Sequence, residues 1–213
     1  MRLTRLLTAG LLAGLMLLGN AQADKILIFL GDSLTDGYML PRYQAYPAEI
    51  QKLISKDALQ WRVINAGLSG DTTAGGLKRL PKILEQKPDF VMIALGYNDV
   101  ARQVPLAEIQ SNLKEMVTTL KEKKIGVALA GVFLPESVAK NERLAFQAMF
   151  HKLALKYRLP LYPNLLHGVD FETQLMEDGL HPNHPGHIQM AHEIYVFLKP
   201  HLSGTASKHF WLF

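Results

Sequence analysis

The chain has 213 residues, of which 48% are hydrophobic and 20% charged, and this composition predicts one globular domain with a full-sized core. It contains no cysteine, which excludes a cysteine nucleophile, a zinc–cysteine site and an iron–sulfur cluster. The formal net charge is only +4 and no group of Lys and Arg is interleaved with aromatic residues, so no nucleic-acid partner is expected.

The N-terminal segment differs from the rest of the chain. Arg2 and Arg5 give it a positive start, residues 6–18 are almost wholly apolar, and Ala21-Gln-Ala23 is a small-x-small cleavage pattern. We therefore predict a signal peptide over residues 1–23, cleaved after Ala23, and a periplasmic or secreted mature protein. An uncleaved membrane anchor is the alternative, but the apolar run is short for a span of about 20 residues.

Short apolar runs alternate with segments of helical period along the remaining chain. Apolar runs on both faces suit buried parallel strands, which we predict at residues 25–30, 61–65, 90–95, 125–132 and 159–162. Amphipathic helices are expected between them, although Pro81 should kink or restart the helix predicted within residues 72–86. The alternation predicts a three-layer α/β/α domain over residues 24–202. Residues 203–213 form a tail with three aromatic residues that could dock on the domain or touch a membrane.

Polar or small residues come directly after three of the predicted strands. Ser33, Gly67 and Asn98 occupy these positions. Because ligands bind at the carboxyl ends of parallel strands, we expect these three residues to lie on one edge of the sheet.

Ser33 is the candidate nucleophile, in the turn Gly31-Asp-Ser-Leu34 after a buried strand. Asp178-Gly-Leu-His181 places a carboxylate three residues before a histidine, so that Asp178 could orient His181 and His181 could take the serine proton. Taken singly, each motif could equally be ordinary turn chemistry.

Two further positions could supply donors to an oxyanion. The side-chain amide of Asn98 and a bare backbone N–H at Gly67 could both point to the same place. Loss of one such donor typically costs about 10²–10³ in rate.

These four motifs, in their order and spacing, resemble the GDSL, or SGNH, hydrolase family, whose blocks supply Ser, Gly, Asn and His. The resemblance runs from about Lys25 to Leu202 and extends in particular to the small exported acyl-CoA thioesterases, lysophospholipases and arylesterases. It implies a five-stranded parallel, flavodoxin-like sheet and hydrolysis of esters and thioesters through an acyl-enzyme. It also implies Ser33, Asp178 and His181 as the triad, with the N–H groups of Ser33 and Gly67 and the Asn98 side chain as oxyanion hole. No metal or cofactor is expected.

The substrate is expected to be a small-molecule or lipid acyl ester, such as an acyl thioester, a lysophospholipid or an aryl ester. Candidate wall residues are Tyr97, Val100, Val104 and Leu134; Tyr97 stands where relatives often have a small residue, and could narrow the acyl pocket. We predict an open cleft for acyl chains of medium length, in a monomer that could contact a membrane surface transiently.

Three other functions remain as alternatives. A carbohydrate acetylesterase of the same fold would prefer short acyl groups. A metal-dependent hydrolase could use the histidines of residues 181–192, but His187 and His192 are five apart, unlike paired helical ligands at four. A non-catalytic binding module would keep the fold and lack the chemistry.

Overall fold

The computed structural model describes residues 24–132 and 134–206. The predicted signal peptide and residues 207–213 of the predicted tail lie outside the described residues. Among the helices that are described, none is both long and apolar enough to cross a bilayer.

The centre of the fold is a five-stranded sheet in the order β2-β1-β3-β4-β5, with every neighbouring pair parallel. This is the flavodoxin-like order, as the sequence predicted. The strands are β1 (Lys25–Gly31), β2 (Trp61–Gly67), β3 (Phe90–Ala94), β4 (Gly126–Ala130) and β5 (Leu161–Tyr162).

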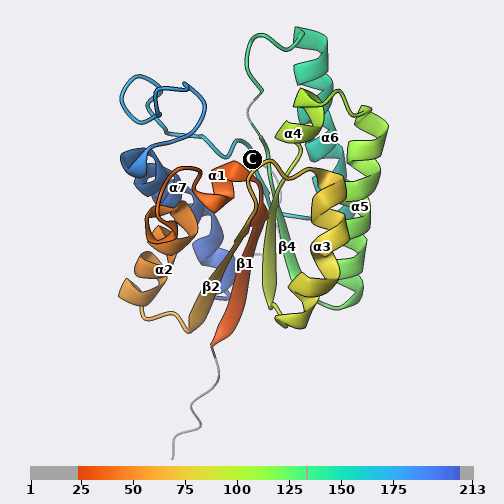
Figure 1. The fold of residues 1–213 in the computed structure, drawn as a ribbon. Coiled ribbons are helices and arrows are strands. Elements are labelled where there is room, and N and C mark those ends of the chain that lie inside the picture. Colours follow the sequence, from red (N-terminus) through yellow and green to blue (C-terminus); the bar gives the residue numbers. More distant parts are fainter. Residues whose placement is uncertain (1–23, 133, 207–213) are drawn as a thin grey trace, which may run out of the picture.

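Helices cover both faces of the sheet and complete three layers (Figure 1). The short α1 (Ser33–Asp36), with α2 (Tyr46–Lys56) and α7 (His184–Leu202), lies on one face. The other face is covered by α3 (Thr73–Glu85), α5 (Leu106–Glu122) and α6 (Lys140–Tyr157). The remaining helical segments are the 3₁₀ turn η2 (Arg42–Gln44) and α4 (Tyr97–Ala101).

Alternate residues of each central strand enter opposite layers of the core. In β1, Leu27 and Phe29 pack against α2 and α7, whereas Ile28 and Leu30 pack against α3 and α5. All four are fully buried. The middle of the strand is therefore apolar at consecutive positions because helices cover both of its faces.

The helix does not restart at Pro81, as one form of the prediction had it, since α3 is a single helix from Thr73 to Glu85. Proline lacks the N–H that would bond to the carbonyl of Leu77, so one helical bond is missing. Leu80 and Ile83, on either side of it, are buried against the sheet. Packing of this apolar face against the sheet thus outweighs the tendency of proline to interrupt a helix.

The expected edge of polar residues is present. Ser33 starts α1 two residues after β1 ends, Gly67 is the last residue of β2, and Asn98 lies in α4, beyond β3. In a parallel sheet these strand ends lie side by side, so the three residues share the carboxyl edge.

Candidate active site

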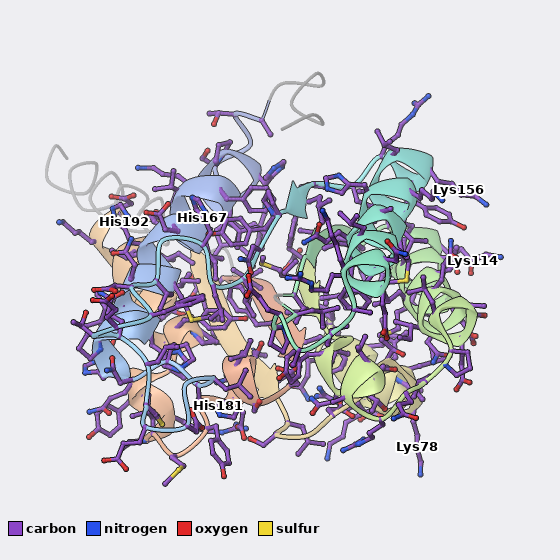
Figure 2. All side chains as sticks on the ribbon, turned by 90° about the horizontal axis from the view of Figure 1, so that it is seen from above. Lys78, Lys114, Lys156, His167, His181 and His192 are labelled. Atoms are coloured by element: carbon purple, nitrogen blue, oxygen red, sulfur yellow. The ribbon has the colours of Figure 1, made fainter. Side chains whose placement is uncertain are left out.

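Three side chains predicted to act together form one chain of hydrogen bonds. His181 Nε2 lies 2.9 Å from Ser33 Oγ, and His181 Nδ1 lies 2.7 Å from Asp178 Oδ2. Ser33 comes from the end of β1, whereas Asp178 and His181 come from the loop before α7. Figure 2 labels His181 in a view from above, at the carboxyl edge of the sheet.

The electrostatics of Asp178 fix the tautomer of His181. Partial burial would raise the pKa of Asp178, but hydrogen bonds from the backbone N–H and ring of His181 and from the N–H of Leu180 lower it to about 2. The carboxylate is then ionised and can only accept, so Nδ1 of the neutral ring carries the proton. Nε2 is left with a lone pair facing the Ser33 hydroxyl.

The turn that carries Ser33 is closely packed. A Cβ on Gly31 would lie 2.0 Å from Thr35 Oγ1, so glycine allows α1 to fold back onto the strand end. Asp32 caps α1 by accepting the N–H of Leu34 at 3.1 Å. The N–H of Ser33 itself donates to none of the described residues, which leaves it available at the helix start.

Asp32 is buried, only 2% exposed, directly beside Ser33. Burial is the main cause that raises the pKa of Asp32, to about 7. The hydrogen bond from the N–H of Leu34 lowers this pKa, whereas the negative charges of Asp71 and Asp99 raise it. The carboxyl therefore changes its charge near neutral pH rather than in acid.

Asn98 is held at the rim by backbone and side-chain acceptors. Its Nδ2 donates to the carbonyl of Asp71 at 2.9 Å and lies 3.4 Å from Asp32 Oδ2. These bonds place the amide group beside the turn that carries Ser33. One of its two N–H bonds is used by the Asp71 carbonyl, and the other has only the long Asp32 contact.

Gly67 does not offer a free donor, in contrast to the sequence prediction. Its N–H donates to Asn65 Oδ1 at 2.9 Å. A Cβ there would lie 2.1 Å from the backbone N of Asp36. Glycine at this position is thus explained by the close approach of α1 to β2, which the sequence pattern alone did not reveal.

Gly70, three residues after Gly67, has an N–H that the sequence prediction did not consider. Its φ of +78° is unfavourable for other residues, and its N–H makes no hydrogen bond to any described part of the chain. The next residue, Asp71, accepts the bond from Asn98. The signal was present in Ser69-Gly-Asp71, a glycine in a polar turn three residues beyond the strand.

Arg79 on α3 ties the strand ends to this loop. It donates to Asp71 Oδ2 at 2.7 Å, to the carbonyl of Ala66 at 2.5 Å and to the carbonyl of Gly31 at 2.9 Å. The ends of β1 and β2 and the Gly70 turn are therefore held in one arrangement. A single arginine in an amphipathic helix gave no sequence signal for this function.

The four expected wall residues divide into two groups. Val100 and Leu134 are 9% and 6% exposed and belong to the core cluster under α5 and α6, so they present little surface to a substrate. Tyr97 and Val104 are half-buried and pack against that cluster. Burial raises the pKa of Tyr97, and the negative charge of Asp32 adds to this.

The histidines near His181 have separate partners. His184 Nε2 bonds to Glu49 at 3.0 Å, and buried His187 accepts the N–H of Tyr46 at 3.1 Å. His192 lies 3.8 Å from the carboxylate of Glu193. Within residues 24–132 and 134–206, no group of three or more potential ligands could hold a metal ion.

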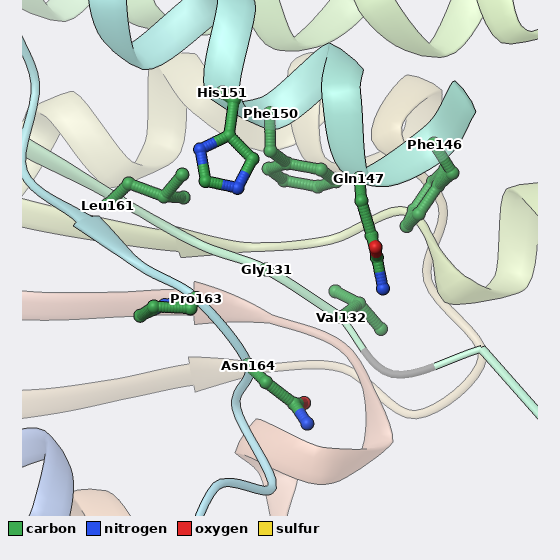
Figure 3. A pocket seen from close by; sticks show the side chains of 9 residues that line it. All are labelled: Gly131, Val132, Phe146, Gln147, Phe150, His151, Leu161, Pro163 and Asn164. Atoms are coloured by element: carbon green, nitrogen blue, oxygen red, sulfur yellow. The ribbon is translucent and has the colours of Figure 1, made fainter. Parts of the chain in front are cut away.

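A cavity of about 230 Å³ lies between α6 and the segments that follow β4 and β5 (Figure 3). Phe146, Phe150 and Val132 form part of its wall. A Cβ on Gly96 would lie 2.9 Å from Phe146, so this ring separates the cavity from the turn that leads to Asn98. The cavity adjoins the site, but none of the triad residues lines it.

Comparisons with known proteins, by sequence and by structure, point to one family of hydrolases. Residues 29–188 match the model of the GDSL-like Lipase/Acylhydrolase family. The chain is 36% identical over 197 residues to Esterase TesA of Pseudomonas aeruginosa, covering 92% of this chain and 98% of that protein. It is 37% identical over 166 residues to Thioesterase 1/protease 1/lysophospholipase L1 of Escherichia coli, covering 76% and 77%. A crystal structure of TesA superposes with a TM-score of 0.79 at 34% identity, covering 83% of this chain and 99% of that one.

Proposed function

This chain belongs to the GDSL-like lipase/acylhydrolase family and is a serine hydrolase of ester bonds, and from that premise we propose that Ser33, His181 and Asp178 are its catalytic triad. The single observation that carries the assignment is the unbroken hydrogen-bond chain from Ser33 Oγ through both ring nitrogens of His181 to Asp178. A nucleophile, a base and a group that orients the base are thus in contact.

The triad begins the reaction by activating the serine. His181 Nε2 takes the proton as Ser33 Oγ attacks the acyl carbonyl carbon, and a tetrahedral intermediate forms. Asp178 stays ionised and stabilises the imidazolium through its bond to Nδ1. The imidazolium then protonates the leaving alcohol or thiol, which departs and leaves Ser33 acylated. Water attacks the acyl-enzyme with His181 again as base, and the acid is released.

The negative oxygen of the tetrahedral intermediate needs hydrogen-bond donors that point at the position it occupies. We assign this role to the N–H groups of Ser33 and Gly70 and to the side-chain amide of Asn98. Three features support the set: the N–H groups of Ser33 and Gly70 are free of bonds to described residues, and Asn98 bonds to the residue after Gly70. Gly67 is left out because Asn65 occupies its N–H.

The acyl chain is proposed to lie over Tyr97 and Val104, with Val100 and Leu134 supporting them from within the core. Leu68, which is exposed at the same edge, extends this surface, whereas the exposed Tyr38 lies against the ring of His181 and is not part of it. Such a surface suits acyl chains of medium length in thioesters, lysophospholipids or aryl esters. The same exposed side chains would permit brief contact of a monomer with a membrane surface.

The mature enzyme is proposed to act in the periplasm or outside the cell. The small-x-small pattern at Ala21-Gln-Ala23 supports cleavage after Ala23, and β1 begins at Lys25. Cleavage at this site would leave the whole sheet intact. N-terminal sequencing of the protein recovered from the periplasmic fraction should begin at Asp24.

The test of the function is hydrolysis of p-nitrophenyl esters from two to twelve carbons by the mature wild type and Ser33→Ala, each with and without EDTA. We expect the highest rate of the wild type at medium or long acyl chains, no effect of EDTA, and no turnover by the variant. A steady decline from acetyl to octanoyl esters would instead favour a carbohydrate acetylesterase. Loss of activity in EDTA would contradict the metal-free triad.

A further inference from the structure

An aromatic ring lies against the imidazole that the proposed mechanism uses as its base. The ring centroids of Tyr38 and His181 are 4.4 Å apart and the planes are tilted by 37°. His181 is held at its two nitrogens by Ser33 and Asp178, and neither bond restrains the faces of the ring. Tyr38 supplies contact on one of those faces.

The backbone around Tyr38 fixes this ring relative to the nucleophile. The N–H groups of Gly37 and Tyr38 both donate to the carbonyl of Ser33 at 3.1 Å. Gly37 has φ +83° and a Cβ on it would lie 2.6 Å from Ala45 Cβ. Met39 on the other side also has a positive φ, +59°, although it is not glycine.

A left-handed residue other than glycine costs of order 1–3 kcal/mol and persists only where the surrounding structure holds it. Met39 gains no burial in return, because its side chain is 78% exposed. The strained turn thus has one evident result, which is to bring the Tyr38 ring over His181. Tyr38 is itself 41% exposed, so it does not serve as ordinary core.

We propose, on the basis of the triad assigned above, that Tyr38 is a positioning residue for the reaction. Its ring keeps the His181 imidazole in the plane between Ser33 and Asp178, and its π face stabilises the positive charge that the imidazole acquires as it takes the serine proton. An aromatic face attracts a cation in this way by its negative quadrupole. The hydroxyl of Tyr38 has no part in either effect.

Titratable groups lie on the elements around His181, and the test must separate the effect of the Tyr38 ring from theirs. Asp178 is on the same loop, Asp32 and Asp36 lie at the start and end of α1, His184 and His187 are on α7, and Glu49 faces them from α2. Substitution of Tyr38 by an uncharged residue leaves all of these charges unchanged.

The experiment compares Tyr38→Phe and Tyr38→Leu with wild type, with Tyr43→Leu as the control. Tyr43 is a more exposed tyrosine, 67%, on the neighbouring η2 turn. Kinetics on a p-nitrophenyl butyrate substrate give kcat and KM across pH 5–9. Titration of the His181 ring by NMR in the resting enzyme gives its pKa without any need for activity, and thermal melting checks that each variant folds.

We expect Tyr38→Phe and Tyr43→Leu to match wild type. Tyr38→Leu should lose about two- to fivefold in kcat with KM unchanged. Since the ring stabilises the charged imidazole, its loss should move the NMR pKa of His181 and the acid limb of kcat/KM to lower pH by roughly half a unit.

The inference is overturned if Tyr38→Leu has the kcat and the His181 pKa of wild type. It is equally overturned if Tyr38→Phe loses as much as Tyr38→Leu, because the hydroxyl would then matter, or if only KM changes, because the ring would then contact substrate. Failure of the triad would look different: Ser33→Ala would retain activity whatever the Tyr38 variants did.

Discussion

Asp32 and His187, two buried groups on the face that carries α1, α2 and α7, should make the unfolding free energy depend on pH in opposite directions. We predict that the two pH dependences cancel in the wild type. Asp32 has its pKa raised by burial from 3.8 to about 7. His187 has its pKa lowered, by burial and then by the charge of His184, from 6.5 to about 4. Each factor of ten in an ionisation constant corresponds to about 1.4 kcal/mol.

The signs follow from which state binds more protons. A raised carboxyl pKa favours the folded state below pH 3.8, and this stability is lost as pH rises to about 7, by about 4 kcal/mol in all. A lowered histidine pKa favours the folded state above pH 6.5, and this stability is lost as pH falls to about 4, by about 3 kcal/mol. Between pH 4.5 and 7 the two contributions oppose each other, so wild type should be nearly flat.

Single substitutions should expose each contribution. Asp32→Asn keeps an oxygen for the N–H of Leu34, and His187→Asn places Oδ1 where the imidazole has the Nδ1 that accepts the N–H of Tyr46. On acidification from pH 7 to 4.5, Asp32→Asn should lose about 2–3 kcal/mol of unfolding free energy and His187→Asn should gain about 2–3 kcal/mol. The half-buried His201, whose pKa burial also lowers, would act in the same direction as His187.

The assay is urea denaturation of the chain without residues 1–23 at half-unit steps of pH, followed by tryptophan fluorescence, to which buried Trp61 contributes. The slope of stability against pH is the readout, because any constant loss from repacking affects every pH equally. Parallel pH curves for wild type and both variants would refute the reasoning, since neither group would then titrate with folding.

The other predictions concern the oxyanion site and its scaffold. Asn98→Ala should lower kcat by about 10²–10³ while the melting temperature stays within a few degrees, measured on a medium-chain ester; a change below tenfold would remove Asn98 from the oxyanion hole. Gly67→Ala should lower the unfolding free energy by about 1–3 kcal/mol because its Cβ meets the backbone of Asp36. Gly70→Ala meets nothing closer than 3.6 Å but keeps a φ of +78°, which costs about 1–2 kcal/mol, and it should lower kcat more than Gly67→Ala does. Equal rate losses in the two glycine variants at equal stability would contradict the exchange of Gly67 for Gly70.

The centre of the sheet could be predicted from the sequence because β1, β3 and β4 are apolar runs that both helical layers bury. The order of β2, β1 and β3 came from resemblance to a family, since no local pattern states which strands are neighbours. The continuous α3 was mispredicted because the preference of Pro81 is local, whereas the burial of Leu80 and Ile83 is a property of the assembled sheet.

In the site, Ser33, Asp178 and His181 were predicted as a triad from the resemblance to a family, and the structure brings the three side chains within hydrogen-bond distance. Gly67 was predicted as a donor because it directly follows a strand, and only the folded chain shows that Asn65 occupies its N–H. The contacts of Arg79 and of the Tyr38 ring were not predicted, for a related reason. The hydrogen bonds of Arg79 join segments that are distant in sequence, and the position of the Tyr38 ring depends on a backbone turn with positive φ.

The measurement that tests the account most directly is labelling of the mature enzyme with an organophosphonate, followed by mass spectrometry of its peptides. One adduct should form, on the peptide that contains Ser33, in step with the loss of esterase activity. His181→Ala should react far more slowly and Ser33→Ala should not react. An adduct on another serine, or full activity in Ser33→Ala, would contradict the assignment of Ser33 as nucleophile.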